Sequence, residues 1–143
     1  MKKQLIFWFG ILGALLFVVA SILGGLQIED YSVIIQYISE SYATGLPNTA
    51  YLRFMYMTSG LLLALFGFMA STEITKSKGV RIGLLLFAIF YGLGTISTGF
   101  FPCDLGCPSG GENISLSQFI HNTSGFLAYA VVPFCLIGIG LSS

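Results

Sequence analysis

Long apolar segments alternate with short polar connections along the whole chain. Four of these segments carry little or no charge, and they occupy residues 5–26, 51–70, 80–101 and 119–141. About 20 helical residues are needed to cross the hydrocarbon core of a bilayer. The pattern therefore predicts an all-α integral membrane protein, with a four-helix bundle that forms one membrane domain over residues 1–143.

The connection after the first apolar segment has a helical pattern of its own. Its apolar and aromatic positions recur every three or four residues, at Tyr31, Ile35, Ile38 and Tyr42. Asp30 is suited to start a helix here, and the glycine and proline that follow are suited to end it. We expect a short amphipathic helix over residues 31–43 that lies along the membrane surface or caps the bundle, with its tyrosines at the headgroups.

Composition supports a membrane location and limits the partners. The chain has 143 residues, of which 55% are hydrophobic and 8% are charged, and its mean hydropathy is +0.88. Soluble domains contain about 25% charged residues. Lipid must therefore solvate much of the surface. The net charge is zero and no basic cluster occurs, so we expect the lipid bilayer as a partner and no nucleic acid.

Charged residues predict the orientation. Five of the six basic residues precede the first span or lie around the connection between the second and third spans: Lys2, Lys3, Lys76, Lys78 and Arg81. Five of the six acidic residues lie in the other two connections: Glu29, Asp30, Glu40, Asp104 and Glu112. Basic residues concentrate on the cytoplasmic side of membrane proteins. We therefore expect a cytoplasmic N-terminus, with loops 27–50 and 102–118 outside.

Small residues recur on one face of three spans. The second span has Gly60, Ala64, Gly67 and Ser71, the third has Ala88, Gly92, Thr95 and Gly99, and the fourth has Gly125 and Ala128. Helices in lipid associate where small side chains let their backbones approach. We expect these stripes to make contacts within one bundle. A contact with another copy of the chain or another membrane helix, or a groove for lipid, is the alternative.

Cys103 and Cys107 lie in a tight turn between the third and fourth spans. Outside the cytoplasm such a pair tends to oxidise, and this spacing allows the short Cα separation of a disulfide. We expect a disulfide and no cofactor. An alternative is a zinc or other transition-metal site made by Cys103, Cys107 and His121, with Asp104 as a further ligand. A thiol exchange site is less consistent with the sequence, since its usual spacing is C-x-x-C.

Four polar side chains are predicted at the outer ends of the spans: Glu40, Arg53, Asp104 and His121. An ionisable group at this depth needs a partner or a wet cavity. We interpret the four as a candidate binding pocket that faces outward. In a simpler alternative, Arg53 reaches toward lipid headgroups and His121 bonds to a loop carbonyl. The chain contains no G-x-S-x-G, H-E-x-x-H or P-loop motif, so no catalytic residue is assigned.

Two patches resemble a family of bacterial multi-pass membrane proteins known only as domain of unknown function 998. They are "YISESYA" at residues 37–43, and "GFFPCDLGCP" followed by "SLSQFIHNTSGFLAY" at residues 99–108 and 115–129. The resemblance implies a multi-pass fold in the inner (plasma) membrane of a bacterium and no established activity. Members usually have about two further spans, so a short or truncated member is expected. Recurrent motif residues of the family correspond to Glu40, Cys103, Asp104, Cys107 and His121.

The sequence favours a non-enzymatic membrane component that binds a lipid or a partner helix at its outer face. The alternative is a metal-dependent or redox enzyme that uses His121 and Asp104 with Cys103 and Cys107. A transporter fragment is a third hypothesis. It would need ionisable residues near the centres of the spans, and the sequence has none there.

Overall fold

The computed structural model describes residues 1–74, 77–111 and 113–142, which contain helices and no strand. The long helices are α1 (Lys2–Leu26), α2 (Ala50–Glu73) and α5 (Leu116–Ser142). The remaining long element is continuous and consists of α3 (Lys78–Phe87), the π-helical turn η2 (Ala88–Leu93) and α4 (Gly94–Phe100). A short 3₁₀ helix, η1 (Ile38–Tyr42), lies between α1 and α2.

Four helical segments of the described chain are long and apolar enough to cross a membrane: Lys2–Leu26, Ala50–Glu73, Lys78–Phe100 and Leu116–Ser142. The prediction of an all-α membrane protein with four spans is confirmed. Each span starts or ends within a few residues of the predicted apolar segment. The third span is the continuous element α3–η2–α4.

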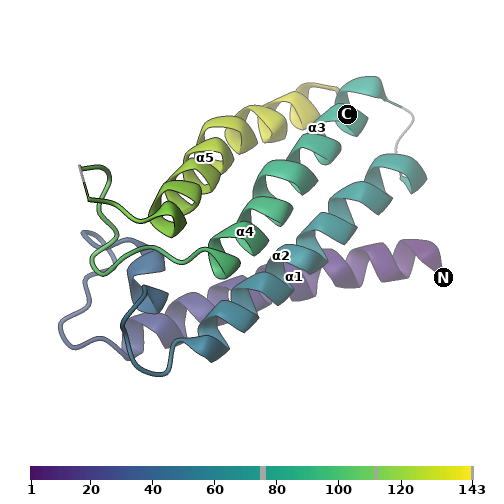
Figure 1. Ribbon diagram of the computed structural model, residues 1–143. Coiled ribbons are helices and arrows are strands. Elements are labelled where there is room, and N and C mark those ends of the chain that lie inside the picture. Colours follow the sequence, from purple (N-terminus) through teal and green to yellow (C-terminus); the bar gives the residue numbers. More distant parts are fainter. Residues whose placement is uncertain (75–76, 112, 143) are drawn as a thin grey trace.

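The four spans form an open row instead of a closed bundle (Figure 1). Helix α2 packs against α1 on one side and against the third span on the other, and α5 packs against the third span. Within the described chain, α1 and α5 make no contact with each other. The connections after α1 and after α4 lie together at one end, at the left of Figure 1, which we call the loop end.

Glycine and alanine bring α2 and the third span close together. A Cβ added at Gly60 would lie 2.7 Å from the carbonyl oxygen of Gly92, and one added at Gly92 would lie 2.7 Å from the Ala64 Cα. A Cβ at Gly67 would lie 2.8 Å from the Leu84 carbonyl oxygen. The predicted contact between these two small-residue stripes within one bundle is confirmed. No larger side chain fits at the three glycines unless the backbones separate.

The outer helices of the row present apolar side chains to their surroundings. Only 6% of the most apolar part of α5 and 17% of that of α1 are buried, compared with 44% for α2. Large side chains such as Phe126 and Phe134 are exposed by 70% and 74%. An apolar surface this continuous is stable in lipid and not in water.

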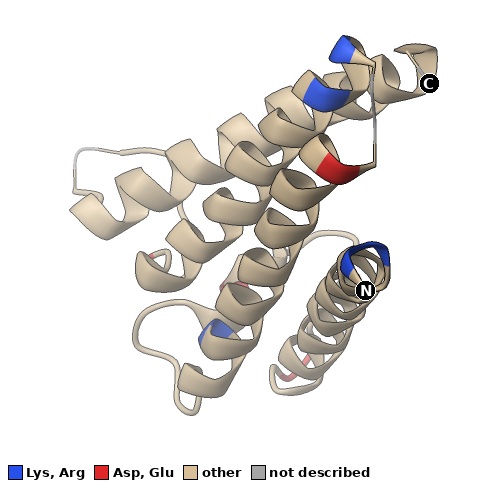
Figure 2. Cartoon of the chain, turned by 90° about the vertical axis from the view of Figure 1, so that its right-hand side faces the viewer, with Lys and Arg blue, Asp and Glu red and all other residues tan. Residues whose placement is uncertain are grey.

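Charged residues separate to the two ends of the row. Figure 2 shows basic residues where α1 and α3 begin, and α2 ends there with Glu73, whose carboxylate accepts a 2.8 Å hydrogen bond from Lys2. Four acidic residues follow α1 or α4 at the loop end: Glu29, Asp30, Glu40 and Asp104. Lys76 and Glu112, which also entered the charge argument, lie outside the described residues.

The predicted amphipathic helix over residues 31–43 is reduced to the five residues of η1. Turns precede it, and in this segment the Gln36 side chain accepts a 2.8 Å bond from the Ser32 N–H. Asp30 has a φ of 56° and so does not start a helix. Glu40 instead caps η1 by accepting a 2.9 Å bond from the Tyr37 N–H. Tyr42 is 5% exposed and packs inside the row, not among headgroups.

We predict that Gly92→Leu destabilises the protein, since its side chain would push α2 away from the third span. Overpacking of this kind costs about 1–3 kcal/mol or more. Thermal unfolding in detergent measures the loss of stability as a lower midpoint temperature of unfolding. The control is Gly138→Leu, because a Cβ at Gly138 meets no atom within 4 Å. Equal midpoints for the two variants would contradict the close contact.

Candidate binding cavity

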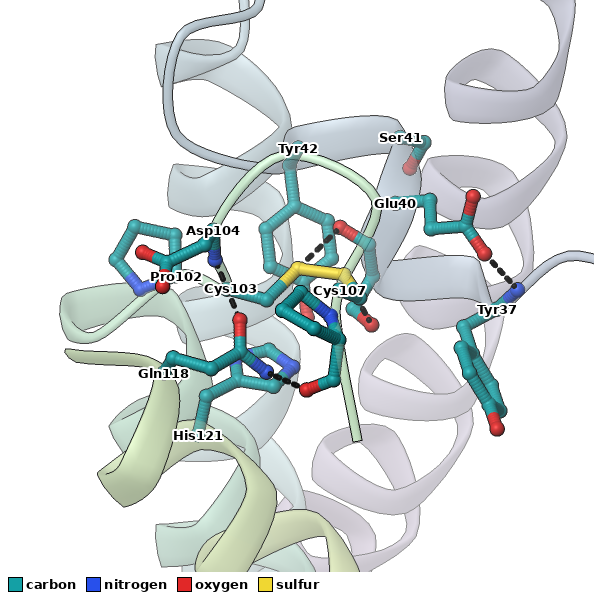
Figure 3. Close-up of a disulfide and its surroundings, with 12 residues drawn as sticks. Tyr37, Glu40, Ser41, Tyr42, Pro102, Cys103, Asp104, Cys107, Gln118 and His121 are labelled. Carbon is teal, nitrogen blue, oxygen red and sulfur yellow. Dashed lines mark hydrogen bonds between the residues drawn. A yellow bond between two sulfur atoms is a disulfide. The ribbon is translucent and has the colours of Figure 1, made fainter. Parts of the chain in front are cut away.

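A cysteine turn begins the connection between α4 and α5. Cys103 and Cys107 lie with their Cα atoms 5.0 Å apart and their sulfur atoms within disulfide distance (Figure 3). Gly106 and Cys107 take φ values of 77° and 44°, so the chain turns back within five residues. Both cysteines are almost fully buried. The structure thus brings together the two cysteines that the sequence paired.

Gln118 attaches this turn to α5. Its side-chain oxygen accepts a 2.6 Å bond from the Asp104 N–H, and its amide donates a 2.9 Å bond to the Pro108 carbonyl. The same amide bonds to Asn122 at 2.7 Å, which in turn donates to the Pro108 carbonyl at 3.0 Å. Gln118 has no exposed surface. Sequence analysis did not identify it, although a glutamine directly before the fourth predicted span and one turn before His121 was an available signal.

The cysteine turn also holds η1 in place. The Thr44 N–H donates a 2.8 Å bond to the Cys103 carbonyl, and the two sulfurs lie 3.4 Å from the Ser39 carbonyl and hydroxyl oxygens. On its other side, η1 rests on α1, where Ser41 contacts Gly24. The segment η1 therefore lies across the loop end and is held from both directions.

Asp104 supports the start of α5. Its carboxylate accepts bonds from the Ser115 hydroxyl at 2.6 Å and from the Ser115 N–H at 2.9 Å. These two bonds lower the pKa of Asp104 below its usual value, and the bond from the hydroxyl has the larger effect. The Ser115 hydroxyl also accepts a 3.0 Å bond from the Gln118 N–H and so caps the helix.

Glu40 and Arg53 are occupied by local partners. Glu40 bonds to the Tyr37 N–H and to the Gln36 side chain, and Arg53 Nε donates a 3.3 Å bond to the Tyr42 carbonyl. Among the described residues, the one ion pair joins Lys2 and Glu73, so it involves neither Glu40 nor Arg53. Each bonds within or beside η1, and no bond joins them to each other or to Asp104.

His121 bonds to the connection before the cysteine turn. Its Nδ1 lies 2.9 Å from the Phe101 carbonyl oxygen, so Nδ1 carries the donated proton. The ring is 7% exposed and packs beside Tyr42, with 6.2 Å between ring centroids. This arrangement corresponds to the simpler alternative, in which the histidine bonds to a loop carbonyl. The four predicted pocket residues are not joined to one another by any hydrogen bond in the described chain.

The cysteines and His121 do not form the geometry of a metal site. Within the described residues, no three side chains of the histidine, cysteine, aspartate or glutamate type gather closely enough to hold a metal ion. The two cysteine sulfurs face each other, and the Nδ1 of His121 faces a carbonyl. The alternative zinc set of Cys103, Cys107 and His121 is therefore not assembled.

His121 instead lines a cavity of about 120 Å³ at the loop end. The cavity lies under η1 and between α1, α2, the third span and α5. We call it the tyrosine cavity, because five tyrosines contribute to its wall: Tyr37, Tyr42, Tyr56, Tyr91 and Tyr129. Of the four predicted pocket residues, only His121 belongs to it. Sequence analysis missed the tyrosines, although Tyr56 and Tyr91 stand out as polar-tipped side chains within apolar spans.

The wall of the tyrosine cavity is mostly apolar and carries polar groups without charge. Hydroxyl groups of Thr95, Thr98 and Ser124 join the tyrosines, and no lysine, arginine, aspartate or glutamate lines the cavity. Burial raises the pKa of Tyr42 well above its usual value, so this phenol is neutral. Tyr91 belongs to the π-helical turn η2, and such turns often occur at functional sites.

Comparison with known proteins identifies the family of the chain. A family model described as "Protein of unknown function (DUF998)" matches residues 11–142. The chain belongs to the DUF998 family. The match covers every residue that lines the tyrosine cavity as well as the cysteine turn. No curated protein and no solved structure matches the chain.

We predict that Gln118→Leu releases the cysteine turn from α5. The variant leaves the Asp104 N–H and the Pro108 carbonyl without this partner, and a lost buried hydrogen bond costs about 1–3 kcal/mol. Hydrogen–deuterium exchange should become faster over residues 101–111. The control is Gln4→Leu, the same substitution at an exposed position of α1. Unchanged exchange in the Gln118 variant would contradict the role of this side chain.

We also predict that Cys103 and Cys107 are oxidised in the purified protein. After unfolding without reductant, iodoacetamide should modify one thiol, that of Cys135, and after reduction it should modify all three cysteines. Intact-mass spectrometry counts the added groups. In the Cys103→Ser variant, two thiols should react without reductant. Modification of all three cysteines in the unreduced wild-type protein would show that the bond does not form.

Proposed function

We propose that the protein is a non-enzymatic membrane component that binds a small amphipathic molecule in the tyrosine cavity. The molecule that we favour is a membrane lipid. The observation that carries this proposal is the cavity itself. It combines aromatic walls with hydroxyl groups and lies at the end of the row where span gives way to loop. Binding sites for small molecules are typically concave, mostly apolar and supplied with a few polar groups.

The open row supports entry from the membrane. Phe17 on α1 and Tyr129 on α5 both line the cavity, and these two helices make no contact with each other in the described chain. Tyr129 is also 77% exposed, so one side of the cavity wall reaches the lipid-facing surface. A lipid could therefore place its polar end in the cavity while its chains stay in the bilayer.

The proposal also includes the orientation of the protein in the membrane. The described basic residues outside α2 lie at the end opposite the loops, and basic residues favour the cytoplasmic side. We infer a cytoplasmic N-terminus in the inner membrane of a bacterium, with η1 and the cysteine turn outside. An oxidised cysteine pair suits that compartment. The tyrosine cavity would then receive its ligand from the outer half of the bilayer.

The enzymatic alternative has less support from the geometry. His121 and Asp104, its acid–base pair, bond to different partners, and Asp104 does not line the cavity. No observation on the described residues favours a second function, so we propose none.

Gly125→Leu tests the proposal. Gly125 lines the cavity, and a Cβ at this position meets no atom within 4 Å, so the leucine side chain would occupy ligand space without disturbing a helix contact. We expect the amount of lipid that co-purifies in mild detergent to fall at least about tenfold compared with the wild-type protein. A tenfold loss corresponds to about 1.4 kcal/mol of binding free energy. Lipid extraction and mass spectrometry provide the measurement.

The matched control is Gly138→Leu on the same helix. A Cβ at Gly138 also meets open space, but this residue does not line the tyrosine cavity. The Gly138→Leu variant should retain the wild-type amount of lipid. If both leucine variants retain the same lipids as the wild-type protein, the cavity is not their binding site.

A further inference from the structure

The aromatic side chains of the tyrosine cavity form a continuous series of neighbours. Successive ring centroids are 6.2 Å apart from His121 to Tyr42, 4.8 Å from Tyr42 to Tyr56 and 5.3 Å from Tyr56 to Phe17. The series ends at Tyr91, 5.9 Å from Phe17. These rings come from α5, η1, α2, α1 and η2 in turn, so every part of the row contributes one. All five residues of this series also line the cavity.

Tyr129 on α5 lines the cavity from the exposed side of that helix. It lines the same cavity as Tyr42, Tyr56 and Tyr91. Its high exposure makes it the ring that a ligand entering from the membrane would meet first. The cavity thus has an aromatic wall on the inside and an aromatic side chain at its rim.

The electrostatic character of this wall selects the charge of the ligand. Aromatic faces carry partial negative charge, and the phenol and hydroxyl oxygens add hydrogen-bond acceptors. The lining contains no lysine or arginine, so a phosphate or carboxylate would enter without a cationic partner. It also contains no acidic side chain that would favour a metal cation over an organic one.

We propose that the group bound in the tyrosine cavity is an organic ammonium. This inference rests on the proposed function and specifies the ligand of that same site. Rings of tyrosine and other aromatic side chains recognise quaternary ammonium groups by cation–π attraction, which is strongest where water is excluded. The volume of about 120 Å³ is close to that of engineered cavities that hold one benzene ring, and so suits a trimethylammonium group.

The ammonium has two sources that share this chemistry. It is either the headgroup of a zwitterionic phospholipid or a free amine such as choline. Of these, the exposed position of Tyr129 and the gap between α1 and α5 favour the lipid headgroup.

The test compares choline with its neutral isostere, 3,3-dimethyl-1-butanol, on the full chain in detergent, and tetramethylammonium serves as the probe in the competition experiment. Titration by saturation-transfer NMR gives both affinities. We expect the cation to bind about tenfold more tightly than the neutral compound, since cation–π attraction acts on the ammonium and not on the neutral compound. Tyr56→Leu should remove that preference and Tyr56→Phe should keep it, because phenylalanine retains the aromatic face.

Competition distinguishes the two sources. In lipid nanodiscs, displacement of tetramethylammonium by phosphatidylcholine, with no displacement by phosphatidylglycerol, would support a lipid headgroup. Displacement by choline with no lipid effect would support a free amine. Equal displacement by diacylglycerol, which has no ammonium, would overturn the inference.

The outcomes also separate this inference from the proposed function. If the neutral compound binds as tightly as the cation, and Gly125→Leu removes both, the cavity binds ligands but does not select an ammonium. If neither compound binds and Gly125→Leu leaves co-purified lipid unchanged, the proposed function fails as well. Cation preference that survives Tyr56→Leu would place the ammonium outside this cavity and so overturn the inference.

Discussion

The close approach of α2 to the third span is the contact on which the rest of the structure depends. In lipid, helices gain nothing by hiding apolar side chains from each other, so their association relies on packing. Gly60 and Gly92 allow backbone to meet backbone here, and Ala64 fills the space between. With these two spans held together, α1 and α5 attach on opposite sides and remain apart. The gap that results is the space in which the tyrosine cavity forms.

The loop end converts that gap into an enclosed site. Polar backbone at the end of a span needs hydrogen-bond partners, and here the two connections supply them to each other. Gln118 holds the cysteine turn on α5, and the turn holds η1 through Thr44 and Ser39. The segment η1 thereby carries Tyr42 into the row, where its ring packs against Tyr56. The polar residues of the loops thus build the lid of the site, while the site itself is lined by uncharged groups.

Sequence patterns identified the elements of the site more reliably than its members. The cysteine pair was predictable because both partners lie in one short turn, so local geometry decides the distance between them. Glu40, Arg53, Asp104 and His121 were grouped because all four are ionisable and near one end. In the structure each of the four forms hydrogen bonds with a different neighbouring group. An ionisable side chain at a membrane boundary needs such a partner, and these partners do not bring the four together. The tyrosines were not identified as site residues, since no pattern within one span shows that phenols from different helices meet around one cavity.

What the sequence alone determined is what depends on local pattern: the four spans, the separation of charge between the two ends, the cysteine turn and the small-residue stripes of the second and third spans. Each follows from residues near one another in the chain and from the contrast between lipid and water. Tertiary structure alone decided which helices touch. That choice turned the stripe of α5 into a cavity wall at Gly125 and Ala128, and it shortened the predicted helix of residues 31–43 to η1. The reason is that the aromatic ring series joins side chains from five elements, and no local pattern encodes a contact between residues as distant as Phe17 and Tyr91.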